Sequence, residues 1–396
     1  MIYAVIGNVQ HPEFGSARIP FPIPSGDYES ILDLMKEWGM GDVLRQDCHV
    51  EEITGSFTVL KRLDGASVNL DELDYLAKRL DSFSPREAAQ FQAMAEKLDL
   101  HDMKDFINLT FCCQQATVIT DFSDLEAVGR AHYMNLNGGC ALAEELEALD
   151  GYETALLLID TGAGTVTEYG VVYDNGMKLE QVYDGRHFPA YDHAASLIAL
   201  AVTSKTAGQE KPAVDYLYLP APDSLIERTF LRSGLNPCDL QYSIEYESLP
   251  EAVSDAVDTA RENVLDLNNM CYAIRQLNSG EMDKLSAAVL MAKPESASEV
   301  GEIAKNLELF DFVPGVRDAE EYGKYMIQES GQFDYDPNLD NFYNYSQYGW
   351  DRINQEQGRF NKLGYIAYKG EMTMEELLHG DPVEQMDQQM DGMGGM

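Results

Sequence analysis

Carboxylate side chains are the groups of this sequence with the greatest capacity for chemistry. The chain has 68 Asp and Glu but only 28 Lys and Arg, which leaves a formal net charge of −40 over 396 residues. Adjacent pairs such as Glu144-Glu145 and Glu320-Glu321 could share acid–base work, although such pairs arise by chance in so acidic a chain. Taken together, the carboxylates offer a negative surface to a basic partner. Duplex DNA carries about one charge per 1.7 Å, so forty charges would match about twenty base pairs.

A glycine-rich turn is the one motif that points to nucleotide chemistry. The segment D-T-G-A-G-T at 160–165 is similar to the phosphate turn of actin-like and sugar-kinase ATPases, where backbone N–H groups hold a phosphate. The second phosphate loop and the adenosine loop of such enzymes have no counterpart in the sequence. A hairpin turn is the simpler interpretation, and a nucleotide-binding enzyme that uses Asp160 to Thr165 stays open as an alternative.

Metal and nucleophile motifs are incomplete in this sequence. Residues 334–340 follow the alternate oxygen spacing of an EF-hand loop, but Leu339 stands where Gly is required and Tyr345 where a bidentate Glu is required. The seven histidines are scattered, and no Walker A, G-x-S-x-G or Cys–His pattern occurs. We therefore expect no metal, no cofactor and no catalytic residues.

The rest of the composition is that of a folded protein. Apolar residues make up 45% of the chain, with 15 Phe and 22 Tyr, so cores can form. The six cysteines include no C-x-x-C pair and are expected to be reduced core thiols. No apolar run is long enough to span a membrane, and the N-terminus does not read as an export signal. The sequence therefore predicts a cytoplasmic protein without a membrane span.

Hydrophobic periodicity predicts the elements that must position the carboxylates. Alternation over 1–24 predicts a hairpin, and apolar residues at helical spacing predict a helix over 27–39 that ends at Gly39. A strand is expected over 48–60. Further helices are expected at 70–80, 88–98, 102–109, 124–134 and 192–204, and further strands at 155–159 and 170–173.

The second half of the chain repeats the order of the first. The apolar positions of 70–80 return at 267–277, and the pattern D-x-E-x-x-G at 124–129 returns at 318–323. The spacing between matched positions is about 196 residues, which indicates a duplicated domain pair and not a solenoid of short repeats.

The predicted fold class is α+β, with small mixed sheet-and-helix modules alternating with helical modules along an elongated chain. Residues 131–177 contain no Lys or Arg and are expected to form part of the acidic face. The expected segments are an N-terminal α+β module at 1–66, a helical module at 67–150, an acidic β-hairpin and helix insert at 151–210, a second α+β module at 211–265, a second helical module at 266–330, a C-terminal aromatic and acidic α+β module at 331–382, and a disordered tail at 383–396.

The C-terminal stretch carries the most specific motifs. It contains F-x-N-Y-x-x-Y-G at 342–349, G-x-F at 358–360 and G-Y-I at 364–366. This pattern resembles the terminal module of the ArdA antirestriction proteins. The helices at 267–277 and 318–323 resemble the central helical domain of the same family, and the helices at 70–80 and 102–109 resemble it still more closely. The resemblance is clearest over 65–135 and 265–370.

The resemblance implies a DNA mimic, carried on mobile genetic elements, that occupies the DNA cleft of type I restriction-modification enzymes. Such proteins are elongated and dimerise through the last domain. This chain is more than twice the usual length, and one chain with two module sets would cover the length that two ordinary chains cover. A homodimer and a monomer therefore both stay open.

We expect a non-enzymatic antirestriction protein whose carboxylates stand in for phosphates. Its partner would be a DNA-binding protein complex of the type I restriction-modification class, and the protein itself would bind neither nucleic acid nor membrane. An acidic interaction scaffold is the alternative besides the nucleotide-binding enzyme. The residues expected to contribute to the collective surface are Asp124, Glu126, Glu144, Glu145, Glu147, Asp318, Glu320, Glu321, Asp334, Asp336 and Asp340.

Overall fold

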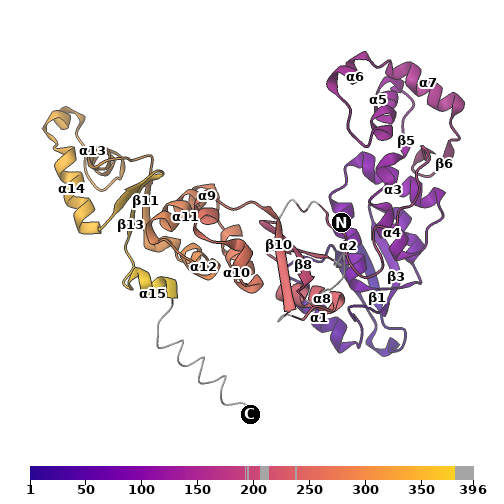
Figure 1. The fold of residues 1–396 in the computed structure, drawn as a ribbon, viewed down its shortest axis with the longest axis horizontal. Coiled ribbons are helices and arrows are strands. Elements are labelled where there is room, and N and C mark those ends of the chain that lie inside the picture. The colour runs from indigo at the N-terminus through magenta and orange to yellow at the C-terminus, as the bar shows by residue number, and fades with distance from the viewer. Residues whose placement is uncertain (192, 194–195, 206–213, 237–238, 380–396) are drawn as a thin grey trace, which may run out of the picture. The chain divides into compact units, whose positions relative to one another are not determined.

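The computed structural model describes residues 1–191, 193, 196–205, 214–236 and 239–379 (Figure 1). The chain divides into two compact units. Unit 1 comprises Met1–His193, Val202–Tyr216 and Pro222–Gln241, and unit 2 comprises Ala194–Ala201, Leu217–Ala221 and Tyr242–Met396. Helices and several small antiparallel sheets make up the chain, which confirms the predicted α+β class. Within the described residues, no helix is both long enough and apolar enough to cross a membrane.

The first sheet of unit 1 has the strand order β2-β1-β3-β4. Its strands, with the helix that follows the hairpin, are β1 (Ile2–Gly7), β2 (Ser16–Phe21), α1 (Tyr28–Glu37), β3 (Cys48–Gly55) and β4 (Ser67–Val68). The predicted hairpin and the helix α1 are both present. The strand expected over 48–60 ends at Gly55, where a Cβ atom would lie 2.6 Å from the carbonyl oxygen of Met1, and η2 (Thr58–Leu63) follows.

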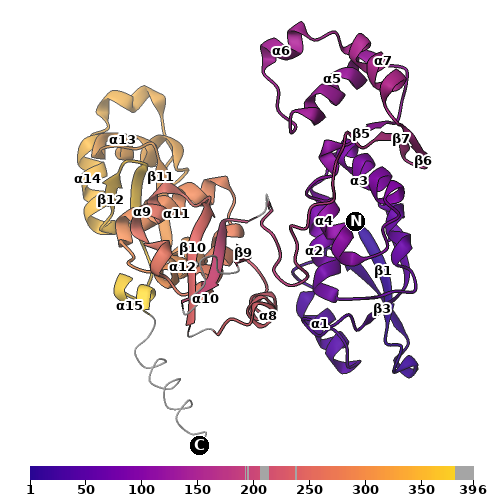
Figure 2. The same ribbon diagram turned by 45° about the vertical axis from the view of Figure 1, so that its right-hand side comes forward.

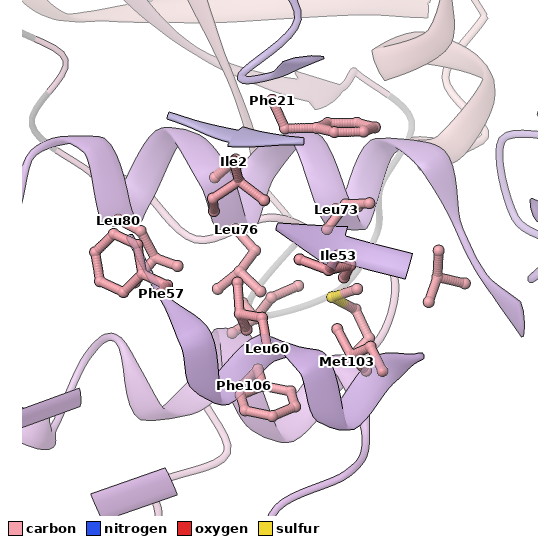
Figure 3. Packing of buried hydrophobic residues seen from close by; sticks show 14 of the residues in the cluster. Ile2, Phe21, Ile53, Phe57, Leu60, Leu73, Leu76, Leu80, Met103 and Phe106 are labelled. Atoms are coloured by element: carbon pink, nitrogen blue, oxygen red, sulfur yellow. The ribbon is translucent and has the colours of Figure 1, made fainter. Parts of the chain in front are cut away.

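Three helices follow this sheet and share its hydrophobic core, and each begins at a polar cap. They are α2 (Leu70–Asp81), α3 (Pro85–Lys97) and α4 (Met103–Leu109). The Asn69 side chain accepts hydrogen bonds from the backbone N–H groups of Asp71 and Glu72 in α2, and Ser84 and Glu87 form a capping box at α3. Figure 3 shows Ile2 and Ile53 of the sheet meeting Leu73 of α2 in the core. Full burial of each such side chain contributes roughly 1.5–3 kcal/mol.

A second sheet of unit 1, ordered β5-β7-β6, carries its own group of helices (Figure 2). The elements are β5 (Thr117–Ile119), α5 (Leu125–Leu136), α6 (Ala143–Ala148), α7 (Gly151–Thr161), β6 (Thr165–Thr167) and β7 (Gly170–Tyr173). Helices α5 and α7 cross at a glycine contact, because a Cβ atom on Gly129 would lie 1.8 Å from the carbonyl oxygen of Gly151. In the sheet, β7 of the hairpin β6-β7 pairs with β5. Strand β5 lies within the segment 67–150, which was predicted to be a helical module.

Two predicted elements are wrong. The strand expected over 155–159 is part of α7, because Asp150 caps that helix and Ala155 and Leu158 bury one helical face. The helix expected over 192–204 contains the strand β8 (Ile198–Ser204), whose first five residues are all buried. A continuous apolar run of this kind suits a central strand that is covered on both faces. Residues 192 and 194–195 of that prediction lie outside the described residues.

The second half begins with a three-stranded sheet ordered β10-β8-β9. The elements after β8 are β9 (Asp215–Leu219), α8 (Asp223–Ser233), β10 (Leu240–Glu247), α9 (Glu251–Ala256), α10 (Val264–Arg275), α11 (Ser279–Ala292) and α12 (Ala297–Lys305). Helix α8 belongs to unit 1 and helices α9 to α12 belong to unit 2. Asn278 forms a capping box at α11 like that of Ser84 at α3.

Unit 2 ends in a sheet ordered β11-β13-β12. Its elements are β11 (Phe310–Pro314), α13 (Ala319–Lys324), the π-helix η7 (Tyr325–Glu329), η8 (Pro337–Phe342), α14 (Tyr345–Glu356), β12 (Arg359–Asn361), β13 (Gly364–Tyr368) and α15 (Met374–His379). Val313, Tyr322 and Tyr365 belong to the small core between sheet and helices.

The two halves share element order and strand register. Val118 pairs with Val172 in the first half, and Phe312 pairs with Ile366 in the second, so both partners are displaced by 194 residues. The same displacement relates Gly129 to Gly323, at which a Cβ atom would lie 2.0 Å from the carbonyl oxygen of Tyr345. The repetition predicted from sequence is thus seen in the hydrogen-bonded register, with a spacing slightly shorter than expected.

Four of the five described cysteines, Cys48, Cys112, Cys113 and Cys271, are buried free thiols. Burial raises the pKa of the Cys271 thiol to about 12. The prediction of a core position is wrong for Cys140, which is exposed between α5 and α6, and Cys238 lies outside the described residues.

Candidate acidic interface

Equivalent aspartates begin α5 and α13. Asp124 accepts a hydrogen bond from the backbone N–H of Ala127 (3.0 Å), and Asp318 accepts from those of Glu320 and Glu321 (both 2.9 Å). Both carboxylates are exposed, and each lies at the positive end of a helix dipole. Each N-cap therefore fixes at the surface a negative charge that forms no ion pair with any described residue.

Glutamates two residues further along are also anchored. Glu126 accepts from Arg130 Nε (2.8 Å) and from the backbone N–H of Tyr152 (2.9 Å), which ties the start of α5 to the start of α7. Glu320 pairs with Lys324 Nζ at 2.7 Å. Exposed pairs of this type add little stability, but they partly cancel the charge that a partner would meet.

The short helix α6 presents carboxylates without internal partners. Glu144 and Glu147 are exposed and form no hydrogen bond or ion pair with any described residue, whereas Glu145 accepts the backbone N–H of Leu142 (3.2 Å). Arg130 donates to the carbonyl oxygen of Leu146 and so holds α6 against α5. Since this arginine is already engaged, α6 offers negative charge alone.

The loop before α14 contains the last three predicted residues. Asp334 is exposed and unpaired within the described chain, and Asp336 caps η8 by accepting the backbone N–H of Asn338 (2.9 Å). Asp340 Oδ1 instead accepts from the hydroxyls of Tyr345 (2.6 Å) and Tyr335 (2.8 Å). These hydrogen bonds hold the pKa of Asp340 below its usual range.

Ten of the eleven predicted residues are exposed, and Asp340 is half-buried. They lie at two helix starts, on one short helix and on one loop: five of them in the module at 117–173 of unit 1 and six in the module at 311–367 of unit 2. Four further exposed carboxylates of the first module, Asp150, Glu153, Asp160 and Glu168, lie in the stretch 131–177 that was predicted to form part of the acidic face, whereas exposed Asp121 was not predicted. The signal for Asp121 was present, because Arg130 is the one Lys or Arg of the sequence between 117 and 173.

The second module has more cations, and several of them are already paired. Besides the pair of Glu320 and Lys324, Arg352 contacts Glu356 and Lys362 pairs with Glu251 (2.8 Å), while Lys369, just beyond the module, pairs with Asp311 (2.6 Å). The module at 117–173 therefore presents the purer negative surface of the two.

A polar core supports α13 in the second module. Glu356 Oε2 accepts from the hydroxyls of Tyr322 (2.6 Å) and Tyr365 (2.7 Å), whose rings stack with centroids 3.9 Å apart. The positions 194 residues earlier that match these two tyrosines are Val128 and Val171, which pack in an apolar cluster. The two modules thus share an arrangement of elements but differ in their cores: α5 packs on an apolar cluster, whereas α13 packs on hydrogen-bonded tyrosine and glutamate side chains.

The turn at 160–165 lies where α7 ends. Gly162 donates its backbone N–H to the carbonyl of Leu158 (2.8 Å), and the Thr161 hydroxyl donates to the carbonyl of Leu157 (2.5 Å). Phosphate sites use the positive N-terminal end of a helix, whereas this end carries partial negative charge. Its geometry therefore disfavours a bound phosphate.

No group of three or more His, Cys, Asp or Glu among the described residues is arranged to hold a metal ion. A comparison with protein-family models and a comparison with curated proteins both find no match. The fold, the charge and the contacts described above are therefore the grounds for a function.

Proposed function

We propose that this protein is a non-enzymatic DNA mimic that occupies the basic DNA-binding cleft of a nucleic-acid enzyme. The observation that carries the proposal is the repetition of anchored, exposed carboxylates at positions 194 residues apart, Asp124 and Glu126 in one module and Asp318 and Glu320 in the other. They belong to a chain with a net charge of −40.

The charge is divided evenly between the halves. Residues 1–193 contain 33 Asp and Glu against 13 Lys and Arg, and residues 194–396 contain 35 against 15, so each half carries a net charge of −20. Such self-repulsion opposes the compact state, and a basic cleft that accepts the charge would relieve it. This balance favours a function that uses both halves.

Binding would follow the physics of protein–DNA association with the roles exchanged. Lys and Arg of the target would pair with carboxylates instead of phosphates, and condensed ions would leave the target surface. Carboxylates that are already held by helix caps lose less conformational freedom on binding than free side chains would. The ArdA resemblance favours a type I restriction-modification enzyme in the cytoplasm as the target.

Two alternatives are less well supported. A nucleotide-binding enzyme would need the turn at 160–165, and that turn lies at the unfavourable end of α7. We expect Asp160→Asn to leave inhibition intact. An acidic scaffold would bind partners without competing with DNA, so competition separates it from a mimic.

The test is displacement of a labelled DNA duplex from a purified type I methyltransferase complex, followed by fluorescence anisotropy at physiological salt. We expect the protein to release the duplex and to give no anisotropy change with the duplex alone. Direct binding to the duplex, or capture of the complex without release of DNA, would refute the proposal.

A further inference from the structure

A buried polar joint holds α8 on the first turn of α2 within unit 1. Arg228 donates from Nε and Nη2 to the two carboxylate oxygens of Asp71, at 2.8 and 3.0 Å. Arg232, one helical turn later, donates to Asn69 Oδ1 (2.5 Å) and to the hydroxyl of Tyr183 (3.1 Å). The arginines and Asp71 are largely buried, with side-chain exposures of 13%, 3% and 8%. The first turn of α2 is therefore a receptor for a helix that bears arginines at i and i+4.

Tyr183 extends this joint to a second carboxylate. Its hydroxyl accepts from Arg232 and donates to Glu72 Oε1 at 2.8 Å. Burial of charged groups is tolerated only when they are paired and hydrogen-bonded. The arginines of α8 and the acidic first turn of α2 thus depend on one another.

The first turn of α10 shares its N-cap residue and one backbone contact with the first turn of α2. Asn69 and Asn263 are the N-caps of the two helices. Asp74 accepts the backbone N–H of Ile23 at 2.7 Å, and its counterpart Asn268 accepts that of Ala221 at 2.8 Å. The carboxylate of Glu72 is kept as Asp266, and Asp71 is replaced by Leu265.

The surface at the start of α10 is open among the described residues. Asn263 is exposed, and 49% of Leu265 is exposed although the residue is apolar. Glu262 and Asp266 form no ion pair with any described residue, whereas neighbouring Asp258 and Glu299 pair with Arg261 (3.1 Å) and His379 (3.4 Å). Desolvation raises the pKa of Glu262, a hydrogen bond from the backbone N–H of Ala297 lowers it, and repulsion from Asp266, Glu299 and Asp258 raises it further, so the net pKa is above its usual value. A cation placed here would relieve that repulsion.

We propose that Glu262, Asn263, Leu265 and Asp266 form a docking surface for an arginine-bearing helix of a partner protein, at the position where α2 binds α8 but with Glu262 and Asp266 as the carboxylates in place of Asp71. The warrant is the occupied counterpart in the same chain together with the charge and the exposed leucine of the open one. The partner helix would carry arginines at i and i+4 and an apolar side chain against Leu265. The proposal is independent of DNA mimicry, because it concerns a helix and not a DNA cleft.

A second copy of this chain does not fit the surface. Helix α1 is the counterpart of α8, since each ends before a glycine with positive φ, Gly39 and Gly234. Counting back from that glycine, Asp33 and Glu37 stand where α8 has Arg228 and Arg232. Carboxylates at both positions would be repelled by Glu262 and Asp266.

The experiment uses a fluorescein-labelled, capped peptide with the α8 sequence Pro222–Leu235 and the full-length protein, measured by fluorescence anisotropy. We expect saturable binding that falls about tenfold or more in the double variant Glu262→Gln with Asp266→Asn, as two charge-assisted contacts are lost. The control variant Glu308→Gln with Glu329→Gln removes the same charge from exposed positions of unit 2 and should bind as the unaltered protein does.

Peptide variants make the result decisive. A peptide with Arg228→Gln and Arg232→Gln should bind at least tenfold more weakly. A peptide with Arg232→Glu should regain affinity for the Asp266→Lys protein, which a merely unfolded variant would not allow. Absence of peptide binding, equal loss in the control variant, or failure of the charge exchange would each overturn the proposal.

Discussion

The N-cap aspartates combine a structural role with a surface charge, and substitution can separate the two. Asn is about as good an N-cap as Asp, whereas Ala costs about 1 kcal/mol. We expect Asp124→Asn with Asp318→Asn to keep the unfolding free energy within a few tenths of a kcal/mol per site. The log–log salt slope of inhibition should fall by up to about two units. Asp124→Ala with Asp318→Ala should lower both the free energy of unfolding, measured by denaturant unfolding, and the salt slope of inhibition, measured by DNA displacement. Equal inhibition and slope in the Asn pair would contradict a role for these charges.

Unpaired carboxylates should contribute more to binding than paired ones. Glu144→Gln with Glu147→Gln removes two charges that no described residue neutralises, so the salt slope should fall by about two units. Glu320→Gln with Lys324→Gln leaves the net charge unchanged and should alter the slope little. DNA displacement at several salt concentrations measures both, and a larger effect of the paired set would contradict the account.

Asp340 should make stability depend on pH. Its pKa in the folded state is depressed by hydrogen bonds from Tyr345 and Tyr335, so its contribution is present above the unfolded value of about 3.9 and is lost as pH falls through the folded value. The gap in thermal midpoint between the unaltered protein and Asp340→Asn should therefore narrow as pH falls from 6 to below 3. Asp334→Asn, which removes a carboxylate that forms no hydrogen bond or ion pair with any described residue, should show no such change. A constant gap for Asp340→Asn would disprove the role of these hydrogen bonds.

At the scale of elements, the glycine crossings of α5 with α7 and of α13 with α14 should be the least tolerant points of the acidic modules. A Cβ atom on Gly129 would lie 1.8 Å from the carbonyl oxygen of Gly151, so Gly129→Ala must force the helices apart. We expect a loss of about 1–3 kcal/mol, typical of overpacking. Gly280→Ala, whose Cβ would lie 3.5 Å from its nearest neighbour, is the control and should be neutral or stabilising. Denaturant unfolding measures both, and equal stabilities would contradict the crossing geometry.

Elements with a polar cap and a regular apolar face could be predicted from sequence. Helices α2 and α4 begin after Asn69 and Asp102, close to the expected positions, because cap and periodicity agree there. The strand expected at 155–159 failed because a short apolar run has no clear period, and the Asp150 cap with Glu153 three residues later was the signal that could have decided it. The tyrosine and glutamate core around Glu356 could not be foreseen, since it depends on contacts between three separate elements.

At the scale of the whole molecule, repetition was visible in the sequence and its register was not. A few matched positions indicated a spacing of about 196 residues, whereas the strand pairs of the modules at 117–173 and 311–367 are 194 residues apart. The displacement differs near the chain start, where the glycines that end α1 and α8, Gly39 and Gly234, are 195 residues apart. Exposure of most candidate carboxylates followed from composition, because so many charges cannot be buried. Which of them are held by caps, tyrosines or lysines required the structure.

The most direct test of the central claim is the salt dependence of DNA displacement from a type I methyltransferase complex by the full-length protein. A collective phosphate mimic predicts that inhibition weakens steeply as salt rises, with a log–log slope of several units. Each exposed single substitution should cost less than about 1 kcal/mol. Inhibition that is independent of salt, or that is abolished by one such substitution in a folded protein, would contradict the account.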